Sequence, residues 1–239
     1  MIKAVVTGHS RGLGAAVAAE LVARGIPVLG LARGHAEVAD GMEQATVDFG
    51  DAAAFGAWLQ GHTLSSFLAG ADTVLLVNNA GVVSPVGPLA EQEPAAALRA
   101  ALINVAAPLA LSAAFVQAAP QAERRILHIS SGAGRSAYPG WSVYCATKAA
   151  LDQHARAVAL DGDARVKAVS LAPGVIDTDM QAEIRATPDA RFPLKQRFVD
   201  MKDSGVLVTP AQCAGRLVDY VLGKRFGSAP VDDLRDTRA

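Results

Sequence analysis

The sequence predicts an α/β fold in which a single doubly wound parallel sheet carries helices on both faces. Three observations support this expectation. Short apolar runs alternate with helix-forming segments along the whole chain, which is typical of parallel sheets. The run at 72–77 is nearly all apolar, as expected for a strand covered on both faces. The first strand leads through a glycine-rich turn into a helix, an arrangement that suits nucleotide binding.

Length and composition restrict the class of protein. The 239 residues suit one domain, 1–239, and 51% of them are hydrophobic. A net charge of −1 gives no electrostatic reason to expect nucleic acid or an anionic membrane as a partner. No uninterrupted apolar run approaches the about 18 residues of a membrane span, and the N-terminal segment lacks the layout of a signal peptide. The two cysteines, Cys145 and Cys213, form no disulfide framework, so a cytoplasmic location is expected. No metal ligand set is predicted.

The glycine-rich turn follows a strand at 2–7 and precedes a helix that ends near Arg24, before Gly25. Glycines let the backbone turn sharply and approach a pyrophosphate, whose charge the helix N-terminus stabilises. The pattern is G-x-x-x-G-x-G rather than the commoner G-x-G-x-x-G, but its strand-turn-helix context is that of a Rossmann-type fold. The residues expected to hold the cofactor are Gly8, Ser10, Arg11, Gly12, Leu13 and Gly14.

The end of the second strand, 27–32, indicates which dinucleotide binds. NAD-binding folds place an acidic residue near this point to hold the ribose hydroxyls. Here Ala32 is followed by Arg33, and Arg11 adds a second cation in the glycine-rich turn. Two arginines without a carboxylate favour a 2′-phosphate, and therefore NADP(H), although either could be a solvated surface cation. A third strand at 45–47 leads to Asp48, which we expect to bind the adenine.

Periodicity and breaking residues define the other elements. The expected helices cover 51–61, 142–160 and 210–222, and a further long helix ends near Ala118. The expected strands cover 72–77, 126–129, 166–171 and 229–231. The charged segment 177–209 follows the strand that borders the cofactor crevice, so we expect one or two mobile helices that form a substrate lid. Asn104 lies within the long helix, where asparagine is locally unfavourable, so it is either tolerated or functional.

Tyr144 and Lys148 are candidate catalytic residues in the helix at 142–160. Four residues correspond to about 6 Å of rise and little more than one rotation, so both side chains share a helix face. A neighbouring ammonium should lower the pKa of the phenol, which could then exchange a proton with a carbonyl or alcohol oxygen. Ser131, at the end of the preceding strand, could donate a hydrogen bond to the same oxygen. Tyr and Lys at this spacing are also common surface neighbours, so the catalytic interpretation requires a hydride carrier elsewhere in the chain.

Taken together, these motifs resemble the short-chain dehydrogenase/reductase family along essentially the whole chain. The matching pieces are T-G-x-x-x-G-x-G at 7–14, N-N-A-G at 78–81, Asn104, Ser131, Y-x-x-x-K at 144–148 and P-G-x-x-x-T at 173–178. The resemblance implies that Tyr144 is the general acid/base and that Ser131 orients the carbonyl. It also implies that Lys148 binds the nicotinamide ribose and that Asn104 holds a water in a proton relay. The further cofactor contacts that it implies are Asn78, Ala80 and Gly81 beside the adenosine, and Pro173, Gly174, Val175 and Thr178 beside the nicotinamide.

A narrower likeness lies in residues 138–146, 172–181 and 203–208, which resemble the sepiapterin reductases and the bacterial benzil reductases of this family. Members of that branch use NADPH, are usually homodimers, and reduce one carbonyl of a vicinal dicarbonyl or keto side chain. The resemblance therefore implies a small-molecule carbonyl substrate in contact with Ser131, Trp141, Tyr144 and Met180. It also implies a homodimer paired through the helices at 92–118 and 142–160.

The substrate class depends on an acidic residue near the C-terminus. The pterin enzymes anchor the guanidine-like edge of their substrate on such an aspartate, and Asp232 matches it best, with Asp233 as the alternative. We expect this carboxylate to face Tyr144 across the substrate, although a solvated surface charge is equally compatible. A regulator that binds NADP(H) without turnover is the alternative function, but it would not need Ser131, Tyr144 and Lys148.

Overall fold

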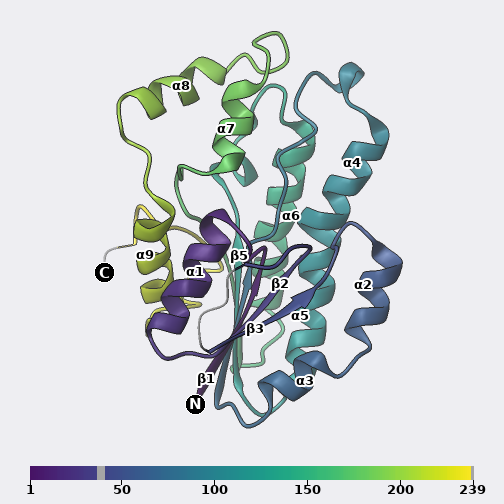
Figure 1. Cartoon of the computed structure of the whole chain (residues 1–239), viewed down its shortest axis with the longest axis vertical. Coiled ribbons are helices and arrows are strands. Elements are labelled where there is room, and N and C mark those ends of the chain that lie inside the picture. Colours follow the sequence, from purple (N-terminus) through teal and green to yellow (C-terminus); the bar gives the residue numbers. More distant parts are fainter. Residues whose placement is uncertain (37–40, 238–239) are drawn as a thin grey trace.

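The centre of the fold is one sheet of seven parallel strands in the order β3-β2-β1-β4-β5-β6-β7, seen in a computed structural model that describes residues 1–36 and 41–237 (Figure 1). The strands are β1 (Ile2–Thr7), β2 (Val28–Ala32), β3 (Met42–Thr46), β4 (Thr73–Asn78), β5 (Glu123–Ile129), β6 (Val166–Ala172) and β7 (Val231–Asp233). The strand order reverses between β1 and β4, which places the crevice of a doubly wound sheet at the carboxyl ends of those strands. The fold class expected from the sequence is confirmed.

Helices cover both faces of this sheet (Figure 1). One face carries α1 (Gly12–Ala23) and α9 (Pro210–Leu222). The other carries α2 (Ala52–Leu59), α3 (Thr63–Leu68), α5 (Ala107–Ala118) and α6 (Ser142–Val158). Helix α4 (Pro94–Ala101) precedes α5 and packs against α6. Two further helices, α7 (Asp179–Ala186) and α8 (Lys195–Asp203), lie beyond the carboxyl ends of the strands. Short helical turns form η1 (Leu89–Glu91), η2 (Leu102–Ala106) and η3 (Gly132–Gly134).

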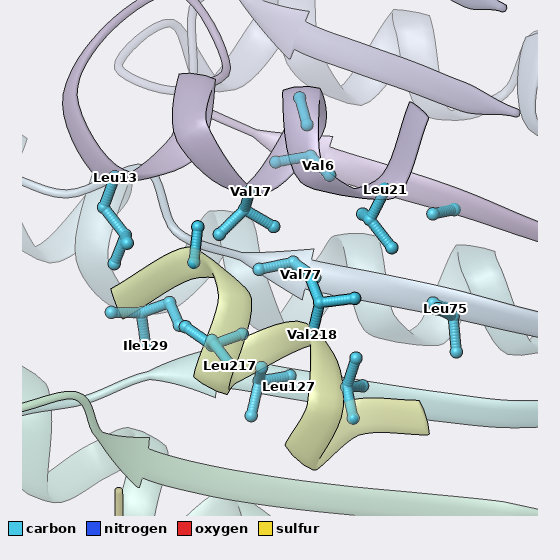
Figure 2. Packing of buried hydrophobic residues seen from close by; sticks show 14 of the residues in the cluster. Val6, Leu13, Val17, Leu21, Leu75, Val77, Leu127, Ile129, Leu217 and Val218 are labelled. Atoms are coloured by element: carbon cyan, nitrogen blue, oxygen red, sulfur yellow. The ribbon is translucent and has the colours of Figure 1, made fainter. Parts of the chain in front are cut away.

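The core beneath α1 and α9 holds the nucleotide-binding turn in place. Val17 and Leu21 of α1 meet Leu217 and Val218 of α9, and all four are fully buried (Figure 2). Leu13, at the start of α1, is buried against the same cluster. Because burial of each such side chain contributes about 1.5–3 kcal/mol, α1 is fixed firmly against the sheet. Its N-terminus therefore stays at the carboxyl end of β1.

The structure departs from the sequence-based boundaries at several elements, among them β5, which begins at Glu123 rather than at 126. Strand β3 begins at Met42 rather than at 45, because pairing with β2 extends it through half-exposed polar positions at the sheet edge. Strand β7 covers 231–233 rather than 229–231, in register with Ser170–Ala172 of β6. Helix α3 was not expected, since its six residues are too short for a clear period. Three of them, Leu64, Phe67 and Leu68, are nevertheless buried.

The helical segment Pro94–Ala118 is long and apolar enough, by length and mean hydropathy alone, to cross a membrane. The core helix of a folded domain meets the same criterion, and 44% of its most apolar window is buried against the rest of the chain. Leu111 and Phe115 are fully buried in the core between this helix and the sheet. A π-helical turn, η2, interrupts the segment and contains Asn104.

Candidate active site

A cavity of about 640 Å³ lies at the carboxyl ends of the strands. Its walls come from the glycine-rich turn after β1, the ends of β2, β4, β5 and β6, the start of α6, helices α7 and α8, and the tail after β7. The predicted site residues that line it are Gly8, Ser10, Arg11, Gly12, Leu13, Arg33, Asp48, Ala80, Gly81, Ser131, Trp141, Tyr144, Lys148, Pro173, Gly174, Val175, Thr178 and Met180. The fold thus brings most of the candidates into one space, although they come from distant parts of the chain.

The glycine-rich turn has the backbone that its sequence indicates. Gly8 and Gly12 have φ values of 68° and 58°, a region that residues with a side chain rarely adopt. Gly14 does not line the cavity. A Cβ atom there would lie 2.2 Å from the carbonyl oxygen of Gly8, so Gly14 permits close packing between α1 and the turn rather than contact with a ligand.

The two arginines predicted to contact the 2′-phosphate line the cavity and are exposed. Arg11 pairs with Asp179 of α7 at 3.1 Å, which joins the glycine-rich turn to the segment above it. Arg33 directly follows β2, the strand that the sequence singled out. Asp48 also lines the cavity, and its carboxylate accepts a hydrogen bond from the Gly50 backbone at 2.8 Å.

Asn78 lies outside the cavity, contrary to the expectation that it contacts the adenosine. Its side-chain amide is buried and bonds to Ser112 at 3.2 Å and to His128 at 3.1 Å. Asn79 lines the cavity instead, and its amide donates to the carbonyl oxygen of Thr7 at 3.0 Å. Successive residues of a strand point to opposite sides, and the sequence could not show which asparagine faces the crevice.

Asn104 does not line the cavity, but its side chain holds neighbouring segments together. Its side chain is 1% exposed and binds both backbone groups of Val82, accepting at 2.9 Å and donating at 2.8 Å. It also lies 3.2 Å from the hydroxyl of Thr147 on α6. Asn104 therefore connects η2, the loop after β4 and the helix that carries Tyr144. Asn104 lies within a π-helical turn, and such turns frequently mark functional sites.

Ser131, Tyr144 and Lys148 meet on the cavity wall. Tyr144 is 7% exposed and Lys148 is 5% exposed, because α6 packs against the end of β5. The Lys148 ammonium donates to the carbonyl oxygen of Ile129 at 2.7 Å and lies 5.6 Å from the centroid of the Tyr144 ring. The shared helix face expected from the four-residue spacing is present.

The electrostatics of this group differ from the expectation. Burial raises the pKa of Tyr144 to about 12, although a hydrogen bond with Ser131 acts in the opposite direction. Burial also lowers the pKa of Lys148 to about 8, while Asp152 acts to raise it. For Tyr144, loss of hydration therefore outweighs the hydrogen bond with Ser131. The expected lowering of the Tyr144 pKa is wrong for these residues by themselves, and the phenol remains a proton donor at neutral pH.

An aromatic wall closes one end of the cavity. Trp141 is 4% exposed and stacks on Phe192, with ring centroids 4.7 Å apart and an interplanar angle of 13°. Phe198 of α8 and Tyr144 pack against the same indole, at centroid distances of 5.5 and 5.3 Å. Met180 of α7 lies beside this cluster. The segment 177–209 thus forms two helices, and its apolar side chains pack onto the start of α6.

Asp232 does not face Tyr144 across the cavity, which contradicts its predicted role. Its carboxylate accepts a hydrogen bond from the Tyr220 hydroxyl at 2.9 Å and another from the Asp233 backbone at 2.8 Å. The alternative, Asp233, is paired with Arg235 at 2.6 Å. Arg235 is the tail residue that lines the cavity. The sequence does not indicate that Arg235 reaches the cavity, because the pairing of β7 with β6 is what brings this residue there.

Two of the histidines that lie outside the predicted site, His9 and His128, are buried. His128 is fully buried, and burial beside His154 and Lys148 lowers its pKa to about 3, as suits a packed neutral residue. The ring of His9 packs on Gly30, where a Cβ atom would lie 2.5 Å from the ring, and it bonds to Gln44 at 2.6 Å.

A parallel sheet of this strand order, with a glycine-rich turn and a buried Ser-Tyr-Lys group around one cavity, defines a nucleotide-dependent oxidoreductase. The family model for short chain dehydrogenase matches residues 3–189, so the chain belongs to that family, whose members bind a nicotinamide cofactor. The chain is 32% identical over 240 residues to a benzil reductase ((S)-benzoin forming) from Bacillus cereus, covering 95% of this chain and 96% of that one. It is 29% identical over 256 residues to the sepiapterin reductase of Xenopus laevis, covering 97% and 95% of the two chains. A short-chain dehydrogenase/reductase from Burkholderia vietnamiensis has 46% identity and a TM-score of 0.71, covering 99% of this chain and 98% of that one.

Proposed function

We propose that this oxidoreductase is an NADPH-dependent carbonyl reductase that transfers hydride to one ketone of a vicinal dicarbonyl. The observation that carries the proposal is that Ser131, Tyr144 and Lys148 line the same cavity as the glycine-rich turn. Similarity to benzil reductases over 95% of the chain supports the substrate class. The predicted pterin anchor, Asp232, faces Tyr220 instead, which makes a pterin substrate the weaker option.

The cavity residues fit a dinucleotide. Gly8 and Gly12 supply a backbone without side chains at the N-terminus of α1, where amide groups bind phosphate oxygens. Arg11 and Arg33 supply charge for a 2′-phosphate at the end of β2. Val175 and Thr178 would adjoin the nicotinamide, and Lys148 would bind its ribose. When bound, the reduced cofactor supplies the hydride that adds to the carbonyl carbon.

The residues of the chain then supply the proton and hold the carbonyl. Tyr144 donates its hydroxyl proton to the developing alkoxide, since a pKa of about 12 keeps the phenol protonated. Ser131 donates a hydrogen bond to the same oxygen. Asn104 keeps the loop after β4 against α6 through Val82 and Thr147. The aromatic wall and the two helices of 177–209 act as the substrate lid that excludes water.

Reduction of benzil by the purified protein tests this function. We expect NADPH absorbance to decrease in proportion to the benzoin formed, and Ser131→Ala should slow this reaction while leaving NADPH binding intact. The competing function is a regulator that binds NADP(H) without turnover. Tight NADPH binding with no turnover of benzil or of a broad panel of ketones would support that alternative and contradict the proposed reductase.

Cofactor preference is a separate prediction of the proposal. Each charge-assisted bond to the 2′-phosphate contributes about 1.5–3 kcal/mol, so the double variant Arg11→Ala/Arg33→Ala should lose most of its preference for NADPH over NADH. The measurement is the ratio of kcat/KM for the two cofactors. Arg225→Ala removes an exposed arginine outside the cavity and serves as the matched control. An unchanged ratio in the double variant would show that the arginines do not bind this phosphate.

A further inference from the structure

The tail after β7 forms part of the cavity wall. Leu171 and Ala172 of β6 pair with Asp232 and Asp233 of β7, so the chain runs beside the end of β6 where Pro173 and Gly174 enter the cavity. A Cβ atom on Gly174 would lie 3.7 Å from the side-chain carbons of Arg235. The aliphatic part of the Arg235 side chain therefore packs on the turn at Gly174, which is proposed to adjoin the nicotinamide.

Asp232 and Asp233, the acidic residues of β7, are both engaged in hydrogen bonds with other side chains. Asp232 is bound to Tyr220, as described above. Asp233 is 8% exposed and accepts two hydrogen bonds from the side chain of Arg235, at 2.9 Å from Nε and 2.6 Å from Nη2. This paired contact directs the guanidinium and raises the pKa of Arg235, which remains a cation under all ordinary conditions. The tail thus presents a hydrogen-bond donor to the cavity, where the sequence predicted an acceptor.

The Asp233–Arg235 pair is joined to α6 through Arg135, although the Arg235 side chain itself is 64% exposed. Arg135 lies 3.7 Å from the Asp233 carboxylate and donates to the carbonyl oxygen of Asp232 at 2.7 Å. The same guanidinium reaches Asp152 of α6 at 3.4 Å, and Asp152 is 1% exposed. Two serine hydroxyls, those of Ser130 and Ser170, donate to Asp152 at 2.8 and 2.6 Å. Arg235 is therefore connected to α6 through Asp233, Arg135 and Asp152.

We infer that Arg235 forms a subsite for the group next to the reacting ketone, and that this subsite favours the carboxylate of a 2-oxo acid. A guanidinium has donors only, so it repels the guanidine-like edge of a pterin and accepts either a second carbonyl or a carboxylate. A carboxylate can accept two parallel hydrogen bonds from a guanidinium and also carries the opposite charge, whereas a ketone offers one neutral oxygen. The inference rests on the proposed ketone reduction and keeps its hydride and proton transfers. What it adds is that the preferred substrate is an anion.

Two substrates that differ only beside the ketone test this inference. Benzoylformate carries a carboxylate, and 1-phenylpropane-1,2-dione carries an acetyl group in its place. We expect Arg235→Gln to lower kcat/KM for benzoylformate by about 10-fold or more, mainly through KM, and to change the dione by less than about 3-fold. Arg235→Lys keeps the charge and should recover part of the loss. The matched control, Arg225→Gln, should leave both substrates unchanged.

A binding measurement separates this inference from the proposed function. Benzoylformate can be titrated into the NADP+ complex, which has no hydride to transfer, with tryptophan fluorescence as the signal, because Trp141 lines the cavity. Selective weakening of this binding in Arg235→Gln supports the subsite even if the acid is not turned over. Equal effects of Arg235→Gln on acid and dione, or no effect on either, would overturn the subsite while leaving the reductase intact. Failure of the wild-type protein to reduce any ketone would instead contradict the proposed function.

Discussion

Tyr144 and Lys148 occupy one face of α6, and burial shifts their pKa values in opposite directions. If Tyr144 is the proton donor, Tyr144→Phe should reduce turnover by about 100-fold or more while NADPH affinity stays nearly constant. The measurements are steady-state kinetics and a binding titration. Tyr220→Phe, which removes a hydroxyl bonded to Asp232 outside the cavity, is the control. Retention of most activity in Tyr144→Phe would exclude this residue as the proton donor.

The pH dependence of the reaction should report the charge of Lys148. Its pKa of about 8 means that the ammonium is present below this pH and is lost as pH rises through it. We therefore expect kcat/KM for ketone reduction to fall above pH of about 8. Asp152 raises the Lys148 pKa, so Asp152→Asn should move this decline to lower pH. An asparagine oxygen can still accept from Ser130 and Ser170.

The control for this profile is Asp203→Asn, which changes an exposed carboxylate at the end of α8. Its pH profile should match that of the wild-type protein. Identical profiles for Asp152→Asn and the wild type would mean that Lys148 does not control the decline.

At the scale of elements, α1 depends on a glycine that touches no ligand. A Cβ atom at Gly14 would lie 2.2 Å from the Gly8 carbonyl oxygen and 2.4 Å from the Asn79 amide, so Gly14→Ala must displace α1 or the turn. We expect it to lower the free energy of unfolding by about 2 kcal/mol or more and to weaken NADPH binding. Chemical denaturation measures the first effect, and a binding titration measures the second.

Helix α9, which packs on α1, offers a matched substitution. A Cβ atom at Gly215 would meet nothing within 4 Å, and alanine has the higher helix propensity. Gly215→Ala should therefore raise the free energy of unfolding by up to about 1 kcal/mol. Equal effects at both positions would show that the contact with Gly8 does not determine the need for glycine.

For the whole molecule, we propose a homodimer paired through α4, α5 and α6. Leu98 of α4 is 65% exposed, and the outer faces of α4, α5 and α6 carry many alanines that allow close approach. Leu98→Glu should therefore convert the dimer into a monomer in light scattering at micromolar concentration. Val206→Glu changes a residue that is 63% exposed between α8 and α9, and it should leave the dimer intact. A monomeric mass for the wild-type protein would contradict the proposed dimer.

The sequence by itself determined the fold class, the glycine-rich turn and the Ser131-Tyr144-Lys148 group, because each depends on local periodicity or on spacing within one or two adjacent elements. Only the tertiary structure decided which side chains face the cavity. Asn79 lines the cavity, whereas Asn78 points into the protein, because neighbouring residues point to opposite sides. Asp232 turns to Tyr220 and Arg235 reaches the cavity because β7 pairs with β6 in one register. Burial, which reverses the expected shift of the Tyr144 pKa, likewise depends on every element packed around it.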